Sequence, residues 1–116
     1  MKLTEFYTQI NGDYTDVITR FGTQQRTQRF VSLFATDTSY NQFITAMNAK
    51  DYQEAFRAIH TLKGICLNLG FTSLLTPVSE ITELLRNDDV DSAKGFIPEL
   101  SSLMELHLNA LNQLKD

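Results

Sequence analysis

The sequence predicts an all-α fold, an antiparallel four-helix bundle with short additional helices at its N-terminus. Its apolar residues recur at spacings of three and four, which is the period of an amphipathic helix and not of a strand. Only two prolines and five glycines occur in the 116 residues, and no repeat or Gly/Ser/Pro linker divides them. Short connections between such helices favour antiparallel packing, so we expect one domain over residues 1–116.

The N-terminal helices are expected over about residues 3–34, ahead of the bundle. Three segments are predicted there, namely Leu3–Ile10, Thr15–Phe21 and Gln24–Phe34. The turn-forming stretches Asn11-Gly12-Asp13 and Gly22-Thr23 separate them.

Four longer helices are expected to form the bundle, at about residues 39–49, 51–69, 72–86 and 91–115. The second has the clearest ends. Asp51 is a candidate N-cap with Glu54 three residues later, and Gly70 can adopt the left-handed closing conformation.

Both prolines fall where a bundle helix is expected. Pro77 removes an amide donor, but the apolar residues keep one phase across it. We therefore prefer a kinked helix to the alternative, a fresh helix start capped by Thr76. Gly95 and Pro98 disfavour the beginning of the last helix, which is firm only from Glu99 onward.

The composition limits the function. The net charge is −4, and the basic residues are scattered, which argues against nucleic acid as a partner. The apolar runs are too short to cross a bilayer, and the N-terminus lacks the apolar region of a signal peptide. A single cysteine excludes an internal disulfide. We therefore expect a cytoplasmic monomer without membrane contact, and Met1 so close to the first helix favours a complete protein.

The helix expected over residues 51–69 separates an apolar stripe from an exposed histidine. At about 100° per residue, the stripe consists of Tyr52, Ala55, Ile59, Leu62, Cys66 and Leu69. His60 points about 130° away from the centre of this stripe, so it faces solvent in mid-helix. Lys63 follows one turn later, and Gly64 comes next although glycine costs about 1 kcal/mol relative to alanine. Phe56 and Leu67 flank His60 on nearly the same face, and such departures from local preference are expected at functional sites.

These neighbours suit a histidine that carries phosphate. Imidazole is largely neutral near pH 7, and its free nitrogen can attack a phosphoryl group. The ammonium of Lys63 can reach that phosphate from one turn away. Gly64 removes a side chain that would block a partner, and the apolar Phe56 and Leu67 offer it a docking surface.

The segment His60-Thr61-Leu62-Lys63-Gly64 resembles the signature of the histidine-containing phosphotransfer (HPt) family. That signature is a histidine, then lysine and glycine at the third and fourth positions after it, and a glycine that closes the helix, here Gly70. The stretches Asp51–Phe56 and Leu84-Leu85-Arg86 also resemble family members, and the similarity covers most of the chain.

The resemblance implies a stand-alone four-helix bundle of HPt type that acts as a phosphorelay intermediate in two-component signal transduction. His60 would accept a phosphoryl group from the aspartate of a response-regulator receiver domain, or from a kinase such as a hybrid histidine kinase, and pass it to another receiver. Members have no kinase activity and no cofactor of their own, because the receiver supplies Mg²⁺ and the acidic pocket.

The resemblance also assigns roles by position. Lys63 and Gly64 match the family's phosphate-stabilising and clearance positions. Arg86 falls where some members place a basic residue near the site. Thr82 stands where several members carry a glutamine that hydrogen-bonds the histidine, which leaves the orientation of His60 open and makes Thr82 a candidate docking residue.

The sequence also allows other interpretations. The chain could be a docking module that binds a receiver or kinase without accepting phosphate, and the N-terminal helices could cover Phe56 and Leu67. A metal-binding bundle or a hydrolase would need inward-facing ligand pairs or a base–nucleophile pair, and the sequence offers neither. His107 shares an apolar stripe and is predicted at the edge of the core, while Cys66 is predicted to be a buried, inert thiol.

Overall fold

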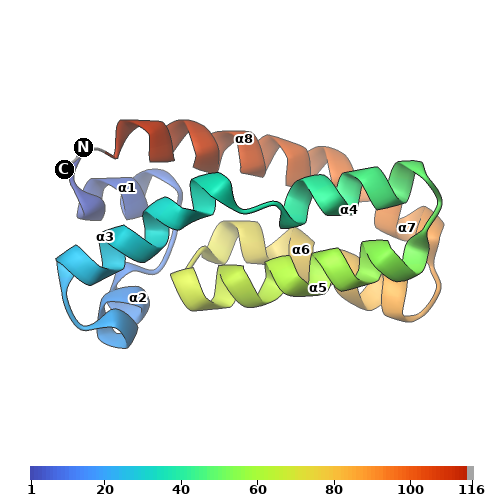
Figure 1. The fold of residues 1–116 in the computed structure, drawn as a ribbon, viewed down its shortest axis with the longest axis horizontal. Coiled ribbons are helices and arrows are strands. Elements are labelled where there is room, and N and C mark those ends of the chain that lie inside the picture. The colour runs from blue at the N-terminus through green and yellow to red at the C-terminus, as the bar shows by residue number, and fades with distance from the viewer. Residues whose placement is uncertain (115–116) are drawn as a thin grey trace.

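The computed structural model describes residues 1–114, and over this range the regular structure is entirely helical (Figure 1). The elements in chain order are α1 (Leu3–Gln9), α2 (Tyr14–Phe21), α3 (Gln24–Ser32), the 3₁₀ turn η1 (Leu33–Thr36), α4 (Ser39–Asn48), α5 (Tyr52–Leu69), α6 (Thr72–Arg86), α7 (Val90–Gly95) and α8 (Ile97–Gln113). No helix in the described part of the chain is long and apolar enough to cross a membrane.

The predicted all-α bundle is confirmed. Helix α4 packs on α5, α5 on α6, and α6 on α8, and Figure 1 shows these four helices running along the long axis of the molecule. Helices α1–α3 lie at one end of the bundle and α7 at the other. Met1 lies beside the end of α8, where its amino group donates a hydrogen bond to the Gln113 carbonyl at 3.1 Å.

Two predicted helices need correction. The helix expected over residues 24–34 ends at Ser32 and tightens into η1, where the Thr36 hydroxyl donates to the Leu33 carbonyl at 3.0 Å. The helix expected over residues 91–115 is two helices that meet at Phe96, because Pro98 has no N–H to continue the α-helical bonds across this point. Its predicted last residue, Lys115, lies outside the described residues.

Helix α6 passes through Pro77 without a break, so the prediction that one helix spans this proline is confirmed, while the kink itself stays a prediction. The alternative start at Thr76 is wrong, because the Thr76 hydroxyl donates back to the Thr72 carbonyl at 3.4 Å instead of capping a new helix. Pro77 itself is buried with Val78 and Ile81, so the apolar face of α6 is uninterrupted.

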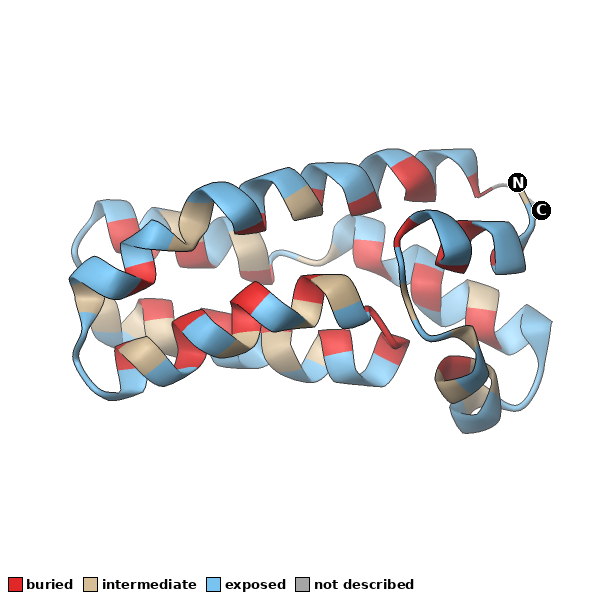
Figure 2. Ribbon diagram, turned by 180° about the vertical axis from the view of Figure 1, so that it is seen from behind, coloured by how far each residue is buried: buried red, intermediate tan, exposed pale blue. Residues whose placement is uncertain are grey.

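The core is continuous from α1 to α8, and Figure 2 shows buried positions recurring along each bundle helix. The Phe71 ring contacts aromatic residues of both α1 and α8. Its centroid lies 6.1 Å from those of Phe6 and Tyr7, and 5.1 Å from those of Phe34 and His107. His107 was predicted at the edge of the core, but its side chain is completely buried. His107 is buried because the N-terminal helices cover this end of the bundle.

Both predicted caps of α5 are present. The Asp51 carboxylate accepts the backbone N–H of Glu54 at 3.3 Å, and Gly70 closes the helix at φ 67°. The Gly70 carbonyl accepts the N–H of Asp13 at 2.8 Å, from the loop between α1 and α2. A Cβ on Gly70 would lie 2.7 Å from the Asp13 carbonyl oxygen, so this close approach requires glycine.

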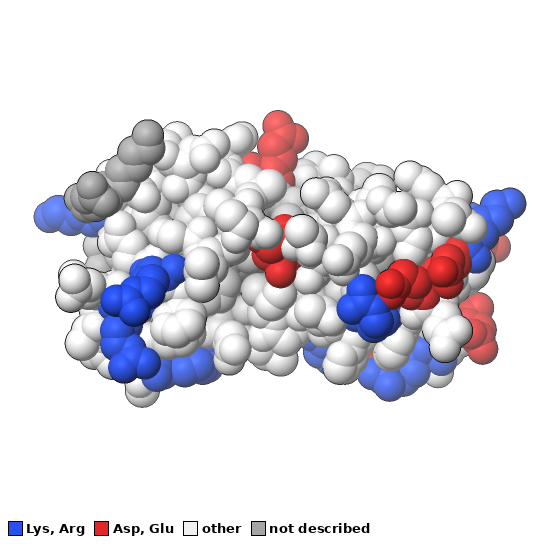
Figure 3. All heavy atoms as spheres, in the orientation of Figure 1, with Lys and Arg blue, Asp and Glu red and all other residues white. Residues whose placement is uncertain are grey.

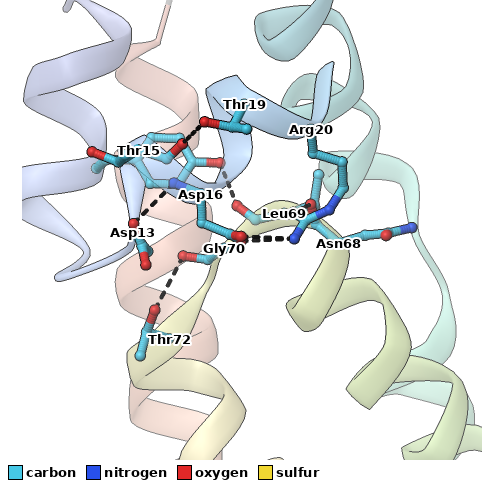
Figure 4. Close-up of polar contacts among 10 residues, drawn as sticks. Asp13, Thr15, Asp16, Thr19, Arg20, Asn68, Leu69, Gly70 and Thr72 are labelled. Carbon is cyan, nitrogen blue, oxygen red and sulfur yellow. Dashed lines mark hydrogen bonds and ion pairs between the residues drawn. The ribbon is translucent and has the colours of Figure 1, made fainter. Parts of the chain in front are cut away.

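Side chains from α1 and α2 also bind the last turn of α5, and Figure 4 shows Arg20 and Asp16 of α2 beside it. The Arg20 guanidinium donates to the Asn68 carbonyl at 2.6 Å and is held by a bidentate ion pair with Asp16 at 2.9 Å. The Tyr7 hydroxyl donates to the Leu69 carbonyl, and burial raises the pKa of this phenol, so it remains a donor. Carbonyls that a helix end leaves without intrahelical partners are therefore satisfied, and α5 is fixed at this end.

Candidate functional site

His60 lies in the middle of α5 on the face opposite the core. Its neighbours Ala58 and Ile59 are completely buried, whereas His60 is exposed, as the sequence predicts. Among residues 1–114, no hydrogen bond or ion pair engages its ring. Its one aromatic neighbour in this range is Phe56, one turn earlier, with ring centroids 5.8 Å apart and planes inclined by 30°. The imidazole is therefore exposed beside the Phe56 ring, and no described residue engages either of its nitrogens.

Lys63 and Gly64 lie one turn after His60, also as predicted. Lys63 is half-buried and forms no ion pair with any described residue, so its charge is not neutralised within this part of the chain. Gly64 is exposed, and a Cβ built on it would meet nothing within 4 Å. The packing of the chain therefore does not require glycine here, and the missing side chain leaves open surface beside His60.

A shallow hollow begins at His60 and runs toward the N-terminal end of α5. The lining residues are Asp51, Gln53, Glu54, Phe56, Arg57, His60 and Thr61. Lys63 and Gly64 lie on the other side of the ring and take no part in it. Any group bound to His60 could thus be approached along α5 from either direction.

Arg57 is the site residue that the sequence interpretation missed. It pairs with the Glu54 carboxylate and donates to the Gln42 side chain of α4 at 2.9 Å. The hydrogen bond from Arg57 lowers the pKa of Glu54, so the carboxylate remains charged. Arg57 lies three residues before His60 and Lys63 three residues after it, which places one cation on each side of the histidine. The equal spacing of these two cations from His60 is the feature of the sequence that could have identified Arg57.

Arg86 reaches the site through Phe56. Its guanidinium carbon lies 5.1 Å from the centroid of the Phe56 ring, and its Nε lies 3.3 Å from a Glu83 carboxylate oxygen. Phe56 is half-buried between Arg86 and His60. The structure therefore brings Arg86 near the histidine without a direct contact.

Leu67 continues the His60 face two turns further along α5. Its side chain is 51% exposed, so the alternative that the N-terminal helices cover it is wrong. Phe56 is covered in part by Arg86 of α6, not by those helices. The docking role predicted for Phe56 and Leu67 remains a prediction, but both side chains are placed where a partner at His60 would meet them.

Thr82 does not belong to this surface, and its predicted docking role is wrong. Its side chain is completely buried, and its hydroxyl donates to the Val78 carbonyl at 2.7 Å within α6. A threonine hydroxyl that donates its one proton to its own helix cannot also donate to a neighbouring ring. The position that carries glutamine in several family members thus supplies no bond to His60 here.

The other histidine and the cysteine are core residues. Burial raises the pKa of the Cys66 thiol to about 12, so the predicted inert thiol is confirmed. The Nδ1 atom of His107 lies 2.7 Å from the Leu103 carbonyl oxygen, and burial lowers the pKa of the ring. Within residues 1–114, no three His, Cys, Asp or Glu side chains are grouped so as to hold a metal ion.

Comparison with known proteins assigns most of the chain to one family. A family model described as the Hpt domain matches residues 32–114, from the last residue of α3 to the last described residue. Neither the search of curated proteins nor that of solved structures returned a match. Because the match covers most of the chain and includes His60, it implies histidine phosphotransfer in two-component signalling. The chain belongs to the Hpt domain family.

Proposed function

We propose that this protein is a phosphorelay intermediate that accepts a phosphoryl group on His60 from a receiver-domain aspartate, or from a kinase, and passes it to another receiver. The observation that carries the proposal is the position of His60, exposed in mid-helix with no partner among the described residues on its ring nitrogens. A buried imidazole could not enter the acidic pocket of another protein.

The transfer needs one nucleophile from this chain. A lone pair on an imidazole nitrogen of His60 attacks the phosphorus of the aspartyl phosphate, so that a P–N bond forms. The P–O bond to the aspartate breaks, and the carboxylate leaves with the electron pair. Transfer to the next receiver is the reverse reaction with a different aspartate, and no redox change or hydrolysis is involved. We expect Mg²⁺ on the receiver and none on this chain.

The neighbours of His60 stabilise the phosphorylated state and admit the partner. Lys63 supplies the cation closest in sequence, and its charge has no partner among the described residues. Arg86 is a second candidate, since its guanidinium can exchange the Phe56 ring and the exposed Glu83 carboxylate for phosphate oxygens. Gly64 provides clearance, while Phe56 and Leu67 contact the receiver.

The same proposal covers the activity, location and partners of the protein. The family carries phosphate and is not enzymatic, so we propose no kinase activity for this chain. We place it in the cytoplasm as a monomer that works with receiver domains and with a hybrid histidine kinase. Its only cysteine, Cys66, is buried, so the fold depends on no disulfide and suits a reducing compartment.

The test is a transfer assay with receiver domains of the source organism, phosphorylated by acetyl phosphate and Mg²⁺. The wild-type chain should take up label, and His60→Gln should take up none while it keeps its helical circular dichroism. His107 is intact in that variant and serves as an internal control for labelling of another histidine. Binding of a receiver without any transfer to the wild type would favour the docking-module alternative instead.

A further inference from the structure

The hollow beside His60 contains one positive charge, that of Arg57. Among the described residues that line it, Asp51 and Glu54 are acidic and Arg57 alone is basic. Figure 3 shows basic and acidic side chains next to one another over the N-terminal half of α5. Two carboxylates would repel a phosphoryl group in this hollow unless a cation lay beside it. The guanidinium of Arg57 is the group placed to provide that cation.

The His60 ring lies over the turn of α5 that precedes it. Side chains of an α-helix lean toward its N-terminus, so a histidine in mid-helix covers the turn before it. The centroid of the His60 ring accordingly lies 5.8 Å from that of Phe56, and His60 lines the hollow whereas Lys63 does not. A phosphoryl group on this ring would therefore project over the turn that carries Phe56 and Arg57.

Arg57 has donors left for such a group. Residues three apart on a helix have Cβ atoms about 5–6 Å apart, and the Arg57 and His60 side chains line the same hollow. The Nε atom of Arg57 donates to the Glu54 carboxylate, and Nη2 donates to the Gln42 side chain at 2.9 Å. Nη1 donates to no described residue. The guanidinium can thus bind a phosphate oxygen while Glu54 still holds its Nε.

The bond to Gln42 is the one that phosphate can replace. Gln42 is neutral, and both it and Arg57 are exposed, so their bond competes with water. A guanidinium binds a phosphate oxygen more strongly than a neutral amide oxygen, and it can do so through two parallel N–H donors. Nη1 and Nη2 of Arg57 can form such a pair once Gln42 is released.

We infer that Arg57 is a second phosphate-binding residue of the site, which releases Gln42 when His60 is phosphorylated. Arg57 acts from the turn before the histidine, and Lys63 acts from the turn after it. The phosphoryl group then lies between two cations on opposite sides of the ring. The inference rests on the proposed function in that it requires phosphate on His60.

The first test needs no partner protein. Phosphoramidate phosphorylates histidine directly, since a P–N bond to the imidazole forms while the P–N bond to ammonia breaks and ammonia leaves with the electron pair. The pKa of the phosphoryl group on the full chain is then followed by ³¹P NMR, and His60→Gln identifies its signal. This pKa should be higher in Arg57→Gln than in the wild type, because a nearby guanidinium favours the dianion.

The second test is the equilibrium constant for transfer from a phosphorylated receiver. It depends only on the free proteins in their two states, so contacts that Arg57 makes inside the complex do not affect it. Arg57→Gln should lower this constant about 3- to 10-fold, as expected for exposed charge-assisted hydrogen bonds. Glutamine is a good helix former, so the helical circular dichroism should not change.

A double substitution separates phosphate binding from mere neutralisation of Glu54. Arg57→Gln leaves the Glu54 carboxylate unpaired, and that charge alone could disfavour phosphorylation. In the Glu54→Gln background this carboxylate is absent. Arg57→Gln should there still raise the pKa of the phosphoryl group and lower the equilibrium constant at least about threefold. The absence of both effects in this background would overturn the inference.

Arg29→Gln is the matched control, because it removes an exposed guanidinium from α3. Figure 3 shows basic side chains gathered at the end of the molecule where α2 and α3 lie. This variant should change neither quantity. A change equal to that of Arg57→Gln would mean that overall charge acts, and it would also overturn the inference.

The failures of the two proposals are distinguishable. If receivers label the wild type and Arg57→Gln matches it in both tests, the inference fails and the proposed function stands. If phosphoramidate labels His60 and no receiver of the organism does, the proposed function fails, and the ³¹P titration still decides the role of Arg57. If neither donor labels His60, both proposals fail.

Discussion

Replacing Gly64 with alanine should make the protein more stable and less active. Glycine in a helix interior is about 0.8–1.0 kcal/mol less favourable than alanine. A Cβ at Gly64 meets nothing within 4 Å, so no steric cost offsets the gain. The φ angle of Gly64 is not positive, unlike those of Gly22 and Gly70, so alanine fits its backbone without strain. We expect the free energy of unfolding to rise by about 0.5–1 kcal/mol.

The same methyl group should slow phosphotransfer. It would stand on open surface one turn from His60, where the receiver has to approach the ring. Forcing an extra carbon into a packed contact costs about 1–3 kcal/mol, which corresponds to a rate loss of roughly 5- to 150-fold. Urea unfolding followed by circular dichroism measures the first effect, and single-turnover transfer from a phosphorylated receiver measures the second.

Gly95→Ala is the matched control, because a Cβ there also meets nothing within 4 Å and the residue lies in α7. It should leave the transfer rate unchanged and should not destabilise the fold. A destabilised Gly64→Ala would show that our account of the packing is wrong. Wild-type transfer by a stabilised Gly64→Ala would show that Gly64 gives no clearance.

Three further predictions follow from contacts near the site and in the core. Lys63→Ala should reduce the transfer rate at least about tenfold and change the free energy of unfolding by less than about 0.5 kcal/mol, with partial rescue by Lys63→Arg; equal transfer by the alanine variant would exclude its phosphate role. Arg20→Met should lower the free energy of unfolding by about 1 kcal/mol in urea titrations, since it removes the donor to the α5 end, and an unchanged midpoint would refute that bond. The folded-state pKa of His107 lies below its unfolded value of about 6.5, so its contribution is fully present above pH 6.5 and declines as the pH falls below it, by at most about 1.4 kcal/mol per pH unit. His107→Met should flatten the stability profile between pH 7.5 and 5, and an equally steep profile in that variant would refute the assignment.

Features that depend on a few neighbouring residues could be predicted from the sequence. The caps at Asp51 and Gly70 were visible because the residue types match the backbone conformations they adopt. The exposure of His60 followed from its angle to the apolar stripe of the same helix. The separation of α7 from α8 at Phe96 was only suggested by Pro98. A proline can lie in the first turn of a new helix or inside a continuous one, and the packing of the preceding residues decides between the two.

Features created by separate segments could not be predicted. Thr82 is buried because α6 is enclosed on more than one side, and His107 is buried because Phe71 and the N-terminal helices cover it. One groove is lined by both Phe21 of α2 and Ile65 of α5, which lie far apart in the chain. Arg57 was predictable in principle, because its spacing from His60 mirrors that of Lys63.

The most direct test of the central claim is to locate the phosphate after exchange with a phosphorylated receiver. Mass spectrometry of the chain, kept at alkaline pH to preserve the P–N bond, should find one phosphoryl group, and fragmentation should place it on His60. Brief acid treatment should remove it, as expected for a phosphoramidate. Phosphate on any other residue, or label that survives in His60→Gln, would contradict the account.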